Sequence, residues 1–117
     1  MRFKDYSHRH GKELLQLIRP GLYSKITESL SGLPAYQHGS EKGKTVKSLM
    51  ESSFKRLGWS LEKPVSLSKG KGDFVDLYKD QVAIEMEWSR FEMFFRDFFR
   101  FMLLYERKEI EVGVVLT

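Results

Sequence analysis

Cysteine is absent from the 117 residues of this chain. Its absence excludes disulfide frameworks and thiolate metal sites. No apolar run reaches the length that a membrane-spanning helix needs, so no membrane partner is expected. Residues 1–12 are polar and charged, which gives no sign of a secretory leader and favours a soluble, cytoplasmic protein.

The composition favours a single globular domain spanning residues 1–117. Apolar residues make up 41% of the chain and aromatic residues 14%, which predicts a core rich in phenylalanine. The formal net charge is +4. Such a basic excess is compatible with a polyanionic partner but does not require one.

Helical periodicity predicts two packing helices near the N-terminus. The first covers residues 7–18, with Ser7 as its N-cap. The second covers residues 21–31 and ends at Gly32. Residues 35–44 then form a polar loop in which Lys42 and Lys44 precede a helix start near Thr45. Backbone amides at that helix start, together with the two lysines, could hold a phosphate; the alternative is a solvated loop.

A third helix is predicted over residues 45–57, and a short extended segment follows from Trp59. Residues 72–76 and 82–88 then read as two antiparallel strands joined by a tight turn at Lys79-Asp80. Alternation along the second strand directs Glu85 and Glu87 to one face, beside a facing strand that carries Asp76. Lys71 lies in the basic loop that leads into this hairpin.

The C-terminal part predicts a βαβ unit, so the chain is assigned to the α/β class. Residues 90–105 form an amphipathic helix between the strand 82–88 and a parallel strand at 110–117. Arg96 and Arg100 fall on its outer face. The aromatic stripe of this helix is expected to pack on the sheet, and its members are Phe91, Phe94, Phe95, Phe98, Phe99, Met102 and Leu103.

Three carboxylates that converge on one small area repel one another, and a divalent cation is the usual means of relieving the repulsion. Asp76 and Glu85 are the natural ligands of such a cation, with the backbone carbonyl of Met86 as a third oxygen. Glu87 could orient or deprotonate the attacking water. Asp73 is a rival first ligand, but it should point to the opposite strand face. In the alternative interpretation these acids lie on a solvent-facing strand and pair with Lys71, Lys79 or Arg90.

The hairpin resembles the PD-(D/E)xK nuclease fold, and more narrowly the type II restriction endonucleases of the BglII and BamHI kind. The resemblance lies in Asp73-Phe-Val-Asp76 and in Val82-Ala-Ile-Glu85-Met-Glu87-Trp-Ser-Arg-Phe91, and weaker similarity extends upstream to Tyr6. Two positions depart from the wider family pattern. Val75 stands where a proline is expected, and Glu87 replaces the lysine, which the BglII and BamHI subgroup also lacks.

The resemblance implies an αβββαβ core with a mixed sheet flanked by helices, formed by residues 45–117 and preceded by two N-terminal helices in residues 1–34. It also implies that Asp76 and Glu85 bind Mg²⁺ and that Glu87 assists the water. Ser89 and Arg90 would lie close to double-stranded DNA, and the lysines that could join them are Lys42, Lys44 and Lys71. Such enzymes act as homodimers on palindromic sites and use no organic cofactor.

The function predicted in this way is a magnesium-dependent type II restriction endonuclease, a site-specific deoxyribonuclease. One alternative is a catalytically inactive nuclease-fold module that only binds DNA. Another is a small structural α/β domain whose acids decorate the surface. Because the sequence ends on a hydrophobic strand at Thr117, we also expect that the natural chain continues beyond it.

Overall fold

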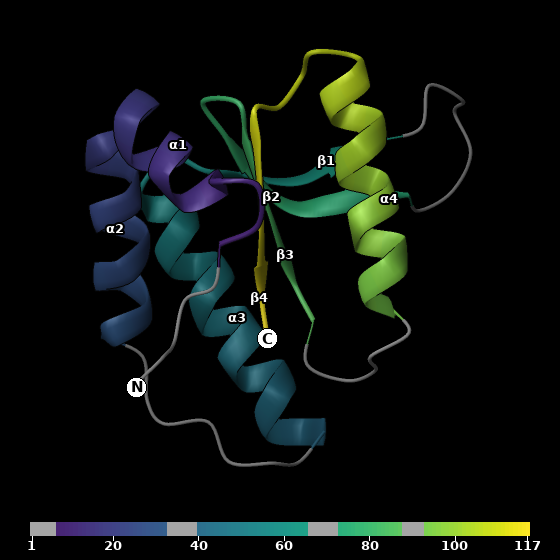
Figure 1. Cartoon of the computed structure of the whole chain (residues 1–117). Helices are drawn as coiled ribbons and strands as arrows, with labels where there is room; N and C mark the ends of the chain where they lie inside the picture. Colours follow the sequence, from purple (N-terminus) through teal and green to yellow (C-terminus); the bar gives the residue numbers. More distant parts are fainter. Residues whose placement is uncertain (1–6, 33–39, 66–72, 88–92) are drawn as a thin grey trace. The chain divides into compact units, whose positions relative to one another are not determined.

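The computed structural model describes residues 7–32, 40–65, 73–87 and 93–117, with only the backbone described for residues 40–45 (Figure 1). The chain divides into two compact units, residues 1–54 and 55–117. Within the described ranges, no helix is both long enough and apolar enough to cross a membrane.

The first unit contains α1 (Gly11–Ile18), α2 (Pro20–Ser31) and most of α3 (Ser40–Arg56). Helices α1 and α2 pack on each other, and α2 starts with proline at a position where the missing N–H costs nothing. The predicted start of the first helix at residue 7 is wrong, because His10 adopts a left-handed conformation (φ 60°) and α1 begins after it. Ser7 still accepts a hydrogen bond from the Lys12 N–H at 3.1 Å.

Helix α3 begins at Ser40, five residues earlier than predicted. The predicted loop over residues 35–44 is therefore wrong for its last five residues. Lys42 and Lys44 lie within the first turns of the helix and not ahead of it. The apolar stripe of the helix is confirmed for its buried members Val46, Met50 and Phe54.

The second unit contains a mixed sheet with the strand order β1 (Ser60–Pro64), β2 (Phe74–Lys79), β3 (Val82–Met86) and β4 (Val112–Leu116). The first two pairings are antiparallel, and β3 pairs with β4 in parallel, as the βαβ prediction requires. The hairpin turn lies at Asp80 and Gln81, one residue later than predicted. Both residues have positive φ (48° and 65°), the conformation of a type I′ turn, whose twist matches that of the two strands.

Helix α4 (Met93–Glu106) connects β3 to β4 and lies against β2 and β4 (Figure 1). Gly113 permits this close approach, because a Cβ at that position would overlap the Phe101 ring. Phe101 and Leu104 of the helix join a buried cluster whose other members are Val65, Val75, Ala83 and Ile110. The mixed α/β class predicted from the sequence is thus confirmed.

The predicted orientation of α4 is wrong. Its buried residues are Asp97, Arg100, Phe101 and Leu104. The described members of the expected core stripe are exposed by 37–67%, and they are Phe94, Phe95, Phe98, Phe99, Met102 and Leu103. The buried carboxylates of the sheet require a cation, and Arg100 brings one to them from the buried face of the helix.

Candidate active site

Asp76 and Glu85 lie on neighbouring strands of the hairpin. The β2–β3 register pairs Leu77 with Ile84, and one further step of the same register sets Asp76 opposite Glu85. Directly opposed residues have Cβ atoms about 5 Å apart. Asp76 is 7% exposed and Glu85 4%. The alternative in which these two acids face solvent is therefore wrong, and the pair needs partners within the protein.

The backbone of Met86 joins this pair. Its N–H donates a 2.8 Å hydrogen bond to Oδ2 of Asp76. The neighbouring Glu87 N–H instead donates to the Leu116 carbonyl on the β4 side, at 2.9 Å. Because successive residues of a strand direct their N–H and C=O groups to opposite sides, the Met86 carbonyl is on the β2 side together with its N–H. The third predicted oxygen is therefore on the same side of β3 as Asp76.

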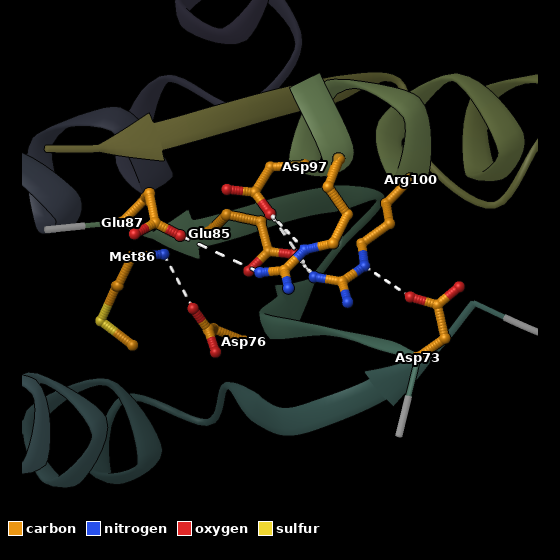
Figure 2. Close-up of polar contacts among 8 residues, drawn as sticks. Asp73, Asp76, Glu85, Met86, Glu87, Asp97 and Arg100 are labelled. Carbon is orange, nitrogen blue, oxygen red and sulfur yellow. Dashed lines mark hydrogen bonds and ion pairs between the residues drawn. The ribbon is translucent and has the colours of Figure 1, made fainter. Parts of the chain in front are cut away.

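Arg100 reaches the pair from α4 (Figure 2). Its Nη1 donates to Oε1 of Glu85 at 3.1 Å and to Oδ1 of Asp97 at 3.4 Å, and its Nε donates to Oδ1 of Asp73 at 2.5 Å. Arg100 and Asp97 were not among the predicted site residues, and Arg100 was predicted to lie on the outer face of the helix. Their i, i+3 spacing, in register with Phe101 and Leu104, was the signal that could have identified this buried face.

The charges at the site are unbalanced. Burial raises the pKa of the Glu85 carboxyl to about 8; the negative charge of Asp76, a hydrogen bond with Asp76 and the charge of Asp97 act in the same direction, and Arg100 opposes them. Burial also raises the pKa of Asp97, with Glu87 and Asp76 contributing and Arg96 and Arg100 opposing. The site therefore favours additional positive charge, either a proton or a cation.

Glu87 lies just after β3, and its side chain is 15% exposed. Arg96 connects it to Asp97 of α4, with Nη2 3.9 Å from the Glu87 carboxylate and Nε 3.6 Å from the Asp97 carboxylate. Asp73 was expected on the strand face opposite to that of Asp76, but its side chain reaches the same site. It precedes β2, and its carboxylate contacts the same guanidinium that binds Glu85 (Figure 2).

The other predicted DNA-contacting residues are outside this geometry. Lys71, Ser89 and Arg90 fall outside the described residues, and so do the side chains of Lys42 and Lys44. In the part of the chain that the structure describes, no group of three or more acidic or histidine side chains is arranged to hold a metal ion. The predicted convergence of three carboxylates is therefore not observed there.

The oxygen atoms that are present do fit a hard cation. Asp76 and Glu85 contribute two buried carboxylates in mutual contact, and the Met86 carbonyl lies on their side of β3. Carboxylate and carbonyl oxygens are the ligands that magnesium and calcium take in proteins. Burial and the negative charge of Asp76 raise the pKa of the Glu85 carboxyl, and a bound divalent cation would offset that repulsion.

The family model described as restriction endonuclease BglII/BglIII matches residues 3–117. The chain belongs to this family. No curated protein matches the chain. As a BglII-family restriction endonuclease it is a type II site-specific deoxyribonuclease that acts on DNA. The alternative of a purely structural domain with acids on its surface is therefore wrong.

Proposed function

We propose that this restriction endonuclease hydrolyses phosphodiester bonds of double-stranded DNA with magnesium held by Asp76, Glu85 and the Met86 carbonyl. The proposal is supported chiefly by one observation. Two buried carboxylates from facing strands meet, and burial, followed by the negative charge of Asp76, raises the pKa of Glu85 to about 8. A protein would retain such an arrangement for a cation-dependent function rather than for stability.

The side chains divide the chemistry between them. A bound magnesium ion supplies Lewis-acid polarisation of a phosphate oxygen and lowers the pKa of water. Asp76 and Glu85 hold the ion, and Asp76 is fixed by its hydrogen bond from Met86. Glu87 orients or deprotonates the attacking water. Glu87 at the position of the usual lysine agrees with a BglII- and BamHI-like variant of the PD-(D/E)xK pattern.

The DNA contacts in the proposal rest on sequence position alone. Ser89 and Arg90 come three and four residues after the end of β3 at Met86, so they would lie close to the DNA. The basic residues Lys42, Lys44 and Lys71 would contact phosphates, which position DNA without reading its sequence.

The decisive experiment uses the purified chain, magnesium chloride and a pool of duplex DNA of diverse sequence. We expect discrete fragments that disappear when magnesium is replaced by EDTA and in the Glu85→Gln variant. Arg107→Gln, a change at a cation that pairs with Glu109, is the control and should cut normally. An uncut pool with a protein that nevertheless binds DNA would support the inactive-module alternative and contradict the proposal.

A homodimer is the second part of the proposal. It is supported by the exposed stripe on α4, whose six members are Phe94, Phe95, Phe98, Phe99, Met102 and Leu103. At 37–67% exposure they present on the order of 600 Å² of apolar surface. Large exposed apolar patches usually mark interaction sites, and a standard interface buries about 800 Å² on each partner. A two-fold dimer would also bring one active site to each DNA strand.

A further inference from the structure

Arg100 is the cation that the protein itself brings to the candidate active site. The residue is 8% exposed, and its guanidinium contacts carboxylates from three places in the chain: Asp73 before β2, Glu85 on β3 and Asp97 on α4 (Figure 2). A buried arginine is tolerated only when its charge is paired. Here the numbers of charges are unequal, because one guanidinium contacts three carboxylates.

The contact with Glu85 has a direct consequence for metal binding. Nη1 of Arg100 lies 3.1 Å from Oε1 of Glu85, so the guanidinium occupies one oxygen of a proposed metal ligand. Two positive charges within a few ångströms of each other repel strongly in a desolvated site. Arg100 and a divalent cation therefore cannot both use Glu85 without a cost to one of them.

We propose that Arg100 is a positioning residue that holds Glu85 in the metal-free enzyme and competes with the divalent cation for it. This inference rests on the proposed function, because it takes Asp76 and Glu85 as the metal ligands. When the cation binds, Glu85 turns from the guanidinium to the ion. Arg100 remains paired through its other contacts, Nε with Asp73 and Nη1 with Asp97, so the exchange leaves no buried charge without a partner.

This arrangement gives Arg100 two opposing effects. Without metal, it stabilises the fold by neutralising Glu85. With metal, it weakens binding, since part of the binding free energy is spent in breaking the Arg100–Glu85 contact. The enzyme would thus be protected from the repulsion between its own carboxylates while the metal is absent, at the cost of requiring more magnesium.

The test is a magnesium titration followed by thermal unfolding of the full chain, with wild type, Arg100→Gln and Arg107→Gln compared. Arg107 is the matched control, because it pairs with Glu109 at 2.7 Å and not with the site. We expect Arg100→Gln to melt below wild type without magnesium. We also expect it to gain more from magnesium and to reach half of that gain at a concentration about tenfold lower. Arg107→Gln should keep the wild-type midpoint.

Arg100→Lys is a second variant that keeps the charge and guards against a failure of Arg100→Gln to fold. Because lysine cannot hold Glu85 and Asp73 with a planar fork, its magnesium midpoint should fall in the same direction by a smaller factor. This inference alone is overturned if the magnesium midpoint of the two Arg100 variants is unchanged or raised while magnesium still raises the melting temperature of wild type through Glu85. Absence of any magnesium-dependent gain in wild type and variants alike overturns the proposed metal site as well.

Discussion

The carboxylate of Asp76 binds the backbone N–H of Met86, with 2.8 Å between Oδ2 and the nitrogen. A side chain thus serves as the acceptor for a strand amide at the end of the β2–β3 ladder. The same carboxylate lies beside Glu85, whose pKa is raised by burial and further by the negative charge of Asp76. Asp76 therefore has a structural role, through its oxygen atom, and an electrostatic role, through its charge, and substitutions can separate the two.

Asp76→Asn should preserve the hydrogen bond and remove the charge, whereas Asp76→Ala should remove both. We expect Asp76→Asn to unfold at a higher urea concentration than wild type without magnesium near pH 8, because its neighbour Glu85 no longer faces a negative charge. Asp76→Ala should be about 1–3 kcal/mol less stable than Asp76→Asn, since the Met86 N–H is left buried and unpaired. Equal stability of the two variants would show that the hydrogen bond contributes nothing.

Glu85 should make the metal-free protein less stable as the pH rises. Its carboxyl has a folded-state pKa of about 8 against an ordinary value of 4.5. Between these values the folded state binds more protons than the unfolded state, so stability falls with pH by up to about 1.4 kcal/mol per unit. Urea unfolding between about pH 5 and pH 8 should show this slope in wild type, and Glu85→Gln should be flatter.

Glu109 should change the stability with pH in the opposite direction to Glu85. Burial acts to raise its pKa, but hydrogen bonds and charge from Lys63 and Arg107 outweigh burial and hold it below the ordinary value. A lowered pKa gives stability that is present at neutral pH and is lost as the pH falls. Glu109→Gln should therefore be less stable than wild type mainly at pH values above 4.5, the ordinary pKa of a glutamate. The fall in stability between about pH 5 and pH 8, which is assigned to Glu85, should be unchanged in this variant. If Glu109→Gln flattened that slope, the assignment to Glu85 would be wrong.

The exposed stripe on α4 should control the oligomeric state. The double variant Phe95→Ser/Phe99→Ser removes two of its members, which are 67% and 60% exposed. We expect sedimentation velocity to show a dimer for wild type and a monomer for this variant, with little change in melting temperature of the monomer. Leu17→Ser on α1, at a leucine that is 80% exposed, is the matched control and should remain dimeric. A monomeric wild type at micromolar concentration would contradict the dimer.

The elements of the second unit were predictable because their signals are local. Alternation along residues 82–86 and the polar turn before them define a hairpin without reference to the rest of the chain. The turn was misplaced by one residue because Asp80 and Gln81 carry positive φ without the glycine that usually marks a type I′ turn. The sequence placed Asp76 on the strand that faces Glu85, but the predicted turn would have set Asp76 opposite Ala83. The observed register pairs Ala83 with Tyr78 instead, so the meeting of Asp76 with Glu85 depends on the turn at Asp80 and Gln81.

The face that α4 turns to the sheet could not be found in this way. Counting apolar residues at helical spacing selects the stripe with the most phenylalanine, from Phe91 to Leu103. The helix instead buries Asp97 and Arg100, because Arg100 meets Glu85, which lies 15 positions earlier. That preference comes from a contact distant in sequence, so periodicity within the helix does not contain it. Burial of charge marks the functional site here, where local rules fail.

Gly113 tests how the position of α4 determines the contacts of Arg100. It pairs with Ala83 across β3 and β4, and an added Cβ would overlap the ring of Phe101, the residue after Arg100. Gly113→Ala must therefore move the helix away from the sheet or strain the ring, at a cost of about 1–3 kcal/mol. A displaced helix also draws Arg100 away from Glu85, so this variant should bind magnesium at a lower concentration than wild type.

The rescue variant Gly113→Ala/Phe101→Leu separates steric displacement from a general loss of stability. Leucine is smaller than phenylalanine and leaves room for the new methyl group, so the double variant should be more stable than the sum of the two single changes predicts. Its magnesium midpoint should return towards the wild-type value as α4 settles back on β4. If the changes in the free energy of unfolding of the two single variants simply add in the double variant, Phe101 and residue 113 do not compete for the same space. The close approach of α4 to β4 would then not be what positions Arg100 beside Glu85.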